Sequence, residues 1–157
     1  MSQTPSAEAA QLIWQHWQNG QPFDNLPPQC RPQTRAQGYA AQAGLPQASG
    51  RSVQGWKIAA TSAAGQSHIN VSGPLAGRIL SGQVLAAGAR VPTTGNRMKV
   101  AEPEMAFVFA HDLPARDQPY GVDEVMAAVA SLHPSIEIPN SRFAEFTAAG
   151  EAQLLAD

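Results

Sequence analysis

The first fifty residues show the spacing of an amphipathic helix. Ala10, Ile13, Trp14 and Trp17 recur on one helical face, and this stripe predicts a helix over residues 6–19 with Ser6 as its N-cap and Gly20 as its end. Residues 21–32 contain four prolines, so we expect irregular structure there. A second, Ala-rich helix is expected over residues 34–43, before Gly44 and Pro46.

After residue 50 the apolar runs become short and glycines separate them. Strands are predicted over residues 53–60, over 78–80 or 84–85, over 104–110 and over 135–138. Helices are predicted over residues 122–132 and 142–155, with a loop over 111–120. Helices come first and strands dominate afterwards, so the pattern indicates an α+β fold without regular βαβ alternation.

Length and composition limit the expected number of domains and the expected binding partners. A chain of 157 residues predicts one domain over residues 1–157, helical over 1–50 and mostly β over 51–157. The net charge of −2 gives no basis for binding nucleic acid or an anionic membrane. A single cysteine, Cys30, excludes an internal disulfide and a cysteine-based zinc site. Without a membrane-spanning run or a secretory signal, we expect a cytoplasmic protein.

Two glutamates at the start of an apolar strand are the leading candidates for chemistry. Glu102 and Glu104 are two residues apart, so both point to one face of a strand, with Cα atoms roughly 6.6 Å apart. Like charges buried together are costly unless a cation lies between them. Glu137, between two isoleucines, is a third carboxylate, and oxygen ligands of this kind suit Mg²⁺ or Mn²⁺. Spacing alone leaves open that Glu102 and Glu104 face solvent at the start of a strand and that Glu137 pairs with a nearby arginine.

Lys57 is a charged residue inside an apolar strand. Beside a metal its amine could transfer protons, whereas on the wet face of an edge strand it would be only a solvated lysine. Both interpretations stay open from the residues alone. Phosphate-binding loops, nucleophile elbows and zinc-protease motifs are absent from the sequence. No pair with ligand spacing occurs among the four histidines, which are His16, His68, His111 and His133.

Five segments carry a family resemblance, and in order along the chain they are residues 55–62, 77–79, 102–109, 134–138 and 141–142. Together they resemble the hydratase/decarboxylase branch of the fumarylacetoacetase superfamily. Members of this branch include 2-keto-4-pentenoate hydratases and 4-oxalocrotonate decarboxylases. The resemblance implies N-terminal helices followed by a mixed β-sandwich or roll of the fumarylacetoacetase C-terminal type.

The resemblance also implies roles for individual residues. Glu102, Glu104 and Glu137 match the ligands of a divalent metal, expected to be Mg²⁺ or Mn²⁺. Lys57 matches an active-site lysine that transfers protons, and Thr61 and Ser135 are expected to bind the substrate. In such a site the metal would chelate the substrate's carboxylate and 2-oxo oxygen and stabilise enolate charge.

The activity implied is that of a hydratase that adds water to a 2-hydroxy-2,4-dienoate in aromatic catabolism. Two alternatives stay open, a 4-oxalocrotonate-type 2-oxo acid decarboxylase and a non-catalytic, truncated family member. The expected ligand is a small 2-oxo or 2-hydroxy-dienoic acid, and the expected assembly is a homo-oligomer, also able to associate with a related decarboxylase or hydratase.

Two departures from the family pattern stand out. Residues 80–83 lack the acidic residue that many hydratases carry there, and this favours the non-catalytic alternative. Family members also continue well past the position of Asp157, so we expect a C-terminally truncated chain with an incomplete β fold.

Overall fold

The computed structural model describes residues 3–157, and the chain forms two compact units. The first unit contains the chain up to Gly95 together with Ser141–Asp157, and the second contains Asn96–Asn140. Each unit is described by itself below, and the single domain expected over residues 1–157 stays a prediction. Within residues 3–157, no helix has both the length and the hydropathy that crossing a membrane requires.

The first unit is built around the long helix α1, Pro5–Asn19. Helix α1 starts earlier than expected, because Thr4 rather than Ser6 is its N-cap and accepts a hydrogen bond from the Ala7 amide at 3.3 Å. Gly20, in the left-handed conformation with φ 64°, ends the helix as predicted. The other helical elements of this unit outside the hairpin described below are α2 (Arg35–Ala43), α3 (Leu45–Ser49), the 3₁₀ turn η1 (Phe146–Ala148) and α6 (Glu151–Ala156).

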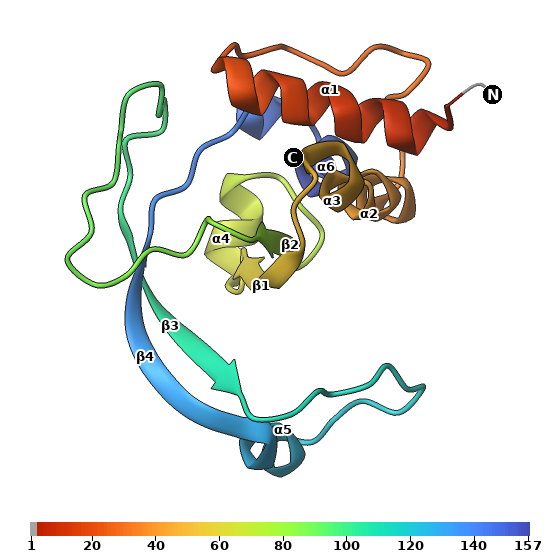
Figure 1. The fold of residues 1–157 in the computed structure, drawn as a ribbon. Helices are drawn as coiled ribbons and strands as arrows, with labels where there is room; N and C mark the ends of the chain where they lie inside the picture. The colour runs from red at the N-terminus through yellow and green to blue at the C-terminus, as the bar shows by residue number, and fades with distance from the viewer. Residues whose placement is uncertain (1–2) are drawn as a thin grey trace. The chain divides into compact units, whose positions relative to one another are not determined.

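Helices α2, α3 and α6 gather beside α1 and enclose the main core (Figure 1). The largest fully buried side chains of this unit are Phe143, Ile13, Leu26, Leu80 and Leu155. Gly38 lies where α2 packs tightly against α6, since a Cβ atom there would lie 2.4 Å from the Ala152 carbonyl oxygen. The contact therefore depends on a residue without a side chain.

A hairpin of two antiparallel strands completes the first unit. Strand β1 (Val53–Ala59) pairs with β2 (Leu75–Leu80), and the short helix α4 (Ala63–His68) lies between them. The strand predicted over residues 53–60 is confirmed, and the one over 78–80 is part of β2. The alternative strand over 84–85 is wrong, since these residues form no regular element. Buried Gln42 ties α2 to this hairpin by donating to the Ala76 carbonyl oxygen at 3.0 Å.

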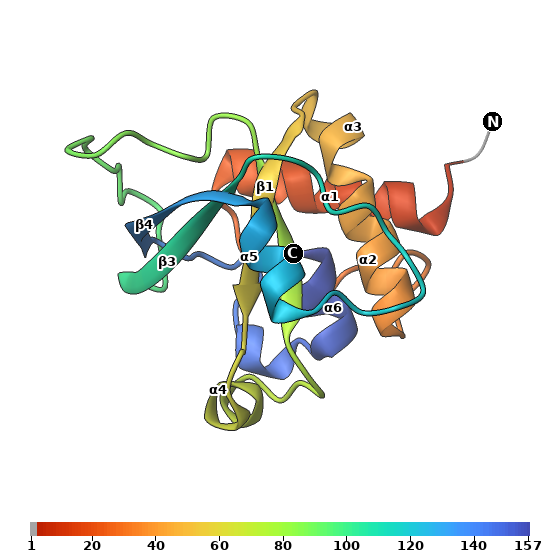
Figure 2. The same cartoon turned by 90° about the horizontal axis from the view of Figure 1, so that it is seen from below.

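The second unit is a curved two-stranded ribbon (Figure 1 and Figure 2). Strand β3 (Glu102–Phe109) pairs antiparallel with β4 (Val129–Glu137), and helix α5 (Val122–Ala128) leads directly into β4. The two ends of the unit are hydrogen-bonded to each other. The Asn96 side-chain amide donates to the Pro139 carbonyl at 2.8 Å, and the Arg97 amide donates to the Asn140 side chain at 3.0 Å.

Two predicted helices are wrong in extent. The helix expected over residues 122–132 ends at Ala128, because the following residues pair with β3 as part of β4. Strand β4 also contains the short strand expected over residues 135–138 and is longer than it. The helix expected over 142–155 is interrupted by Gly150, whose φ of 84° no helix accommodates, leaving η1 and α6. The α+β class is confirmed, whereas the mixed β-sandwich or roll stays a prediction, because the described strands form two separate pairs.

Candidate metal centre

The β3–β4 ribbon has one polar face and one apolar face. Glu102 lies opposite Glu137 in the ladder, and Glu104 lies opposite Ser135. Directly opposite residues in an antiparallel pair share a face, as do residues two apart along each strand. All four side chains therefore belong to one face, whereas the intervening positions carry Pro103, Met105, Phe107, Leu132, Pro134 and Ile136 on the other.

The three glutamates bring their carboxylates together on the polar face. One oxygen from each of Glu102, Glu104 and Glu137 lies within 4.8 Å of the other two. The side chains are less enclosed than expected, since Glu102 and Glu137 are half-buried and Glu104 is exposed. Water thus screens part of their mutual repulsion, which explains how three like charges are tolerated on a two-stranded ribbon.

The geometry fits a hard divalent cation. Protein oxygens bind Mg²⁺ at about 2.0–2.1 Å and Ca²⁺ at about 2.3–2.6 Å, so two ligands of one ion are at most about 4–5 Å apart. The separations within the cluster are compatible with this limit. Three carboxylates on one side also leave coordination positions open for water or a small molecule.

Of the remaining predicted residues, one shares this unit and two do not. Ser135, half-buried, lies directly across from Glu104 on the polar face. Lys57 and Thr61 belong to the first unit. Lys57 is half-buried on β1, and its aliphatic stem lies over its cross-strand partner Gly77, where a Cβ atom would approach the lysine Cγ to 3.0 Å. Thr61 is exposed and follows β1. The roles of all three stay predictions.

The polar face continues along β4 beyond the carboxylates. His133 lies opposite Ala106 and Ser131 opposite Val108, and the Ser131 hydroxyl and His133 Nε2 are hydrogen-bonded at 2.8 Å. This pair was not predicted from the sequence, because it joins a histidine to a serine and not to a second histidine at ligand spacing. The available signal was the alternation of Ser131, His133, Ser135 and Glu137 with apolar residues.

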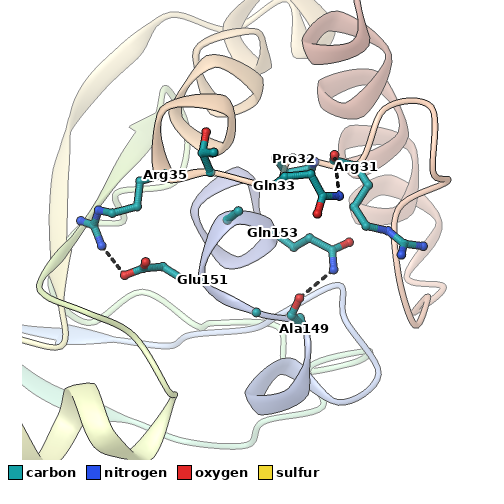
Figure 3. A pocket seen from close by; sticks show the side chains of 10 residues that line it. Arg31, Pro32, Gln33, Arg35, Ala149, Glu151 and Gln153 are labelled. Carbon is teal, nitrogen blue, oxygen red and sulfur yellow. Dashed lines mark hydrogen bonds and ion pairs between the residues drawn. The ribbon is translucent and has the colours of Figure 1, made fainter.

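A hollow of about 300 Å³ in the first unit was also not anticipated (Figure 3). It lies between residues 31–35 and residues 149–153. Two of its charges are paired with each other, since Arg35 and Glu151 form an ion pair, and Glu151 also accepts hydrogen bonds from the Ser72 amide and hydroxyl. Burial alone would raise the pKa of Glu151, but the hydrogen bonds from Ser72 and Arg35 outweigh it and hold that pKa below its usual value.

No protein-family model matches the chain. Two solved structures of 4-oxalocrotonate decarboxylase from Pseudomonas putida G7 match its fold. The structure complexed with magnesium and adipate has a TM-score of 0.81 at 20% sequence identity, and the structure complexed with calcium and acetate has a TM-score of 0.78 at 19% identity. Each match covers 99% of this chain and 59% of the decarboxylase chain. The chain thus spans about three-fifths of the length of these structures, and its fold is similar to that of 4-oxalocrotonate decarboxylase, in agreement with the resemblance seen in the sequence.

Proposed function

We propose that this chain carries the metal site of a lyase acting on a small 2-oxo or 2-hydroxy-dienoic acid. The observation that carries the proposal is the convergence of three carboxylates on one face of the β3–β4 ribbon. The fold supports it, because the structures that share this fold were solved with magnesium or calcium and with a small carboxylic acid, adipate or acetate.

Glu102, Glu104 and Glu137 would hold Mg²⁺ or Mn²⁺ through carboxylate oxygens. When bound, the ion would act as a Lewis acid that polarises the 2-oxo group of the substrate. Ser135, across from Glu104, presents a hydroxyl on the same face and would donate a hydrogen bond to the substrate's carboxylate. Thr61 is proposed for the same task from the first unit.

Lys57 is proposed to transfer the proton that the reaction moves between oxygen and carbon. Its stem is supported by Gly77, so the position of its Nζ atom depends on a contact that any larger residue at 77 would disturb. During ketonisation of a 2-hydroxy-dienoate, the enol proton leaves the oxygen and a proton is delivered to carbon. An amine that alternates between its charged and neutral forms can do both.

The finer activity has two candidates. A hydratase would add the hydrogen and hydroxyl of water across the conjugated double bond. A decarboxylase would break the bond to a carboxylate, and the electron pair would pass to the 2-oxo group as CO₂ leaves. We propose the hydratase as the principal activity, and the decarboxylase as the second candidate, which the identity of the structural neighbours favours. A chain without catalytic activity is the third alternative.

Metal binding is the first test. The melting temperature of the purified chain should rise on addition of Mg²⁺ or Mn²⁺, because the ion binds the folded carboxylate cluster. Glu104→Gln should abolish most of this rise, since it removes one charged ligand without changing side-chain size. Glu145→Gln, an exposed glutamate outside the cluster, is the matched control and should behave as wild type. An equal rise in the wild type and Glu104→Gln would contradict the proposed site.

Turnover is the second test. The loss of the dienoate's ultraviolet absorbance measures consumption, and release of labelled CO₂ separates decarboxylation from hydration. Lys57→Met keeps the stem over Gly77 and removes the amine, so turnover should fall about 10²–10⁴-fold while the metal-induced rise in melting temperature stays. Unchanged turnover in Lys57→Met would reject the role of Lys57. Metal binding without consumption of either substrate would leave the non-catalytic alternative.

A further inference from the structure

The polar face of the β3–β4 ladder carries one ionisable side chain besides the three glutamates, and it is His133. Past the row of Glu104, the next row pairs Ala106 with His133, and the row after it pairs Val108 with Ser131. Successive rows on one face of an antiparallel ribbon are about 7 Å apart. His133 therefore belongs to the same unit as the carboxylate cluster and lies one row beyond Glu104.

The hydrogen bond between Ser131 and His133 leaves one ring nitrogen free. The Ser131 hydroxyl and Nε2 of His133 are 2.8 Å apart, and Nδ1 has no partner among residues 3–157. When Nε2 donates to the hydroxyl oxygen, Nδ1 of the neutral ring keeps a lone pair and can take a proton. The charged ring that results keeps the same donor on Nε2, so the uptake of a proton leaves the pair intact.

His133 is also accessible to an incoming molecule. Its side chain is exposed, and the residue across from it is Ala106, whose methyl group covers little of the ribbon. Imidazole is the side chain that exchanges protons most readily near neutral pH. The neighbouring carboxylates would be occupied as metal ligands and must stay deprotonated for that task. His133 is thus the group of this face that remains available for proton transfer.

We infer that His133 is the general base that takes a proton from the water added to the substrate, and that Ser131 positions its ring. This inference rests on the proposed hydratase activity, because the 2-oxo group of the substrate would be bound at the carboxylate cluster. In a 2-oxo-3-enoate, the carbon that water attacks lies about 2.5 Å beyond the 2-oxo carbon at ordinary bond lengths. A water about 3 Å farther along is in position to attack. One row of the ribbon matches this reach.

The proposed step is a conjugate addition of water. Nδ1 of neutral His133 takes one proton of the water while the water oxygen forms a bond to the far carbon of the double bond. The electron pair of that double bond moves toward the 2-oxo group and gives an enolate. The charged ring then returns its proton to the carbon beside the 2-oxo carbon, and the ketone forms again. One water molecule has been added, His133 is neutral again, and Lys57 keeps the separate ketonisation step.

The substrate 2-oxo-3-pentenoate tests this step alone, because it needs no ketonisation. With Mg²⁺ present, His133→Ala should lower the kcat for hydration about 10²–10⁴-fold, and the metal-induced rise in melting temperature should stay. His133→Gln should be as slow, because an amide forms hydrogen bonds but cannot exchange the proton. Added imidazole should restore part of the rate of His133→Ala. His111→Ala removes an exposed histidine of the same unit from outside the ladder and should hydrate as wild type does.

The positioning role of Ser131 has its own pair of variants. Ser131→Ala should lower kcat up to about tenfold with KM unchanged, as expected for the loss of one hydrogen bond that orients the ring. Ser131→Thr keeps the hydroxyl and suits a strand, so it should retain most of the wild-type kcat. Equal kcat values for Ser131→Ala and the wild type would overturn this role of Ser131.

Contact between His133 and the substrate is measured without turnover. Diethyl pyrocarbonate modifies accessible histidine rings, and His133 and His111 are both exposed. With Mg²⁺ and the unreactive analogue 2-oxopentanoate, modification of His133 should slow severalfold, whereas His111 should react at its original rate. Mass spectrometry of the digested chain separates the two sites.

The outcomes distinguish this inference from the proposed metal site. Metal binding together with equal hydration by the wild type and His133→Ala would overturn the role of His133 alone. The same holds if the analogue does not protect His133, or if a metal-binding wild type releases CO₂ without hydrating 2-oxo-3-pentenoate. Absence of metal binding in the wild type would overturn the proposed function and this inference together.

Discussion

Replacing Gly38 by alanine is expected to destabilise the first unit, although alanine is the better helix former. The added methyl group would lie 2.4 Å from the Ala152 carbonyl oxygen and 2.8 Å from the Leu155 Cβ atom. Both distances are far below van der Waals contact, and both obstacles belong to the body of α6 rather than to a flexible side chain. Helix α6 must therefore move away from α2.

The size of the effect follows from two opposing contributions. Overpacking of a tight contact costs typically 1–3 kcal/mol, and about 3 kcal/mol applies here because a backbone atom is struck. The intrinsic preference of helices for alanine over glycine offsets about 1 kcal/mol of this cost. The free energy of unfolding should thus fall by about 2 kcal/mol, which lowers the urea midpoint by about 1 M.

Urea unfolding followed by tryptophan fluorescence measures this change, because Trp14 lies in the core beside which α2 packs. Gly65→Ala in α4 is the control, since its Cβ atom would approach its nearest neighbour only to 3.4 Å and the helical preference should prevail. A raised midpoint for Gly38→Ala would refute the close packing of α2 against α6.

Three other predictions concern protonation, reactivity and local stability. The pKa of Glu151 is lowered from its usual value of 4.5, so its ion pair with Arg35 and its hydrogen bonds from Ser72 stabilise the native chain above about pH 4.5. This stabilisation is lost as the pH falls through the pKa of Glu151 in the folded chain. Glu151→Gln should therefore reduce the fall in melting temperature at acid pH, and an unchanged fall would contradict this role of Glu151. Burial raises the pKa of the Cys30 thiol, so Ellman's reagent should react slowly with the native chain at pH 8 and rapidly with the chain unfolded in urea. A rapid reaction with the native chain would show that the thiol is accessible. In hydrogen exchange, the amides of β3 and β4 should exchange faster than those of α1, because a lone two-stranded ribbon is marginally stable, and equal protection would disprove this.

Only part of the carboxylate cluster could be predicted from the sequence. The spacing of Glu102 and Glu104 fixes their common face as soon as the segment is a strand, and that strand was predicted. The partnership with Glu137 depends on the register of β3 against β4, which is set by pairing across more than thirty residues. No local pattern encodes this register, so the residues alone could offer Glu137 as a third carboxylate but could not place it beside the other two.

One error in the fold comes from competition between local and long-range preferences, and another comes from the two local roles of proline. Val122, Val125, Met126 and Val129 repeat with helical spacing, yet the ladder with β3 takes over at Val129 and ends the helix. Pro46 was read as a terminator, but proline is equally suited to the first turn of a helix, and it lies near the start of α3.

The hydrogen bonds of Asn96 and Arg97 to Pro139 and Asn140 have a consequence for engineering. They hold the entry and exit of the second unit together, so this stretch is an insertion whose two ends meet. Insertions of this kind can be exchanged or shortened with little effect on their host. All three proposed metal ligands belong to the insertion, whereas Lys57 and Thr61 belong to the host. Ligand preference could therefore be changed by replacing residues 96–140 alone, while the helices of the first unit keep their sequence.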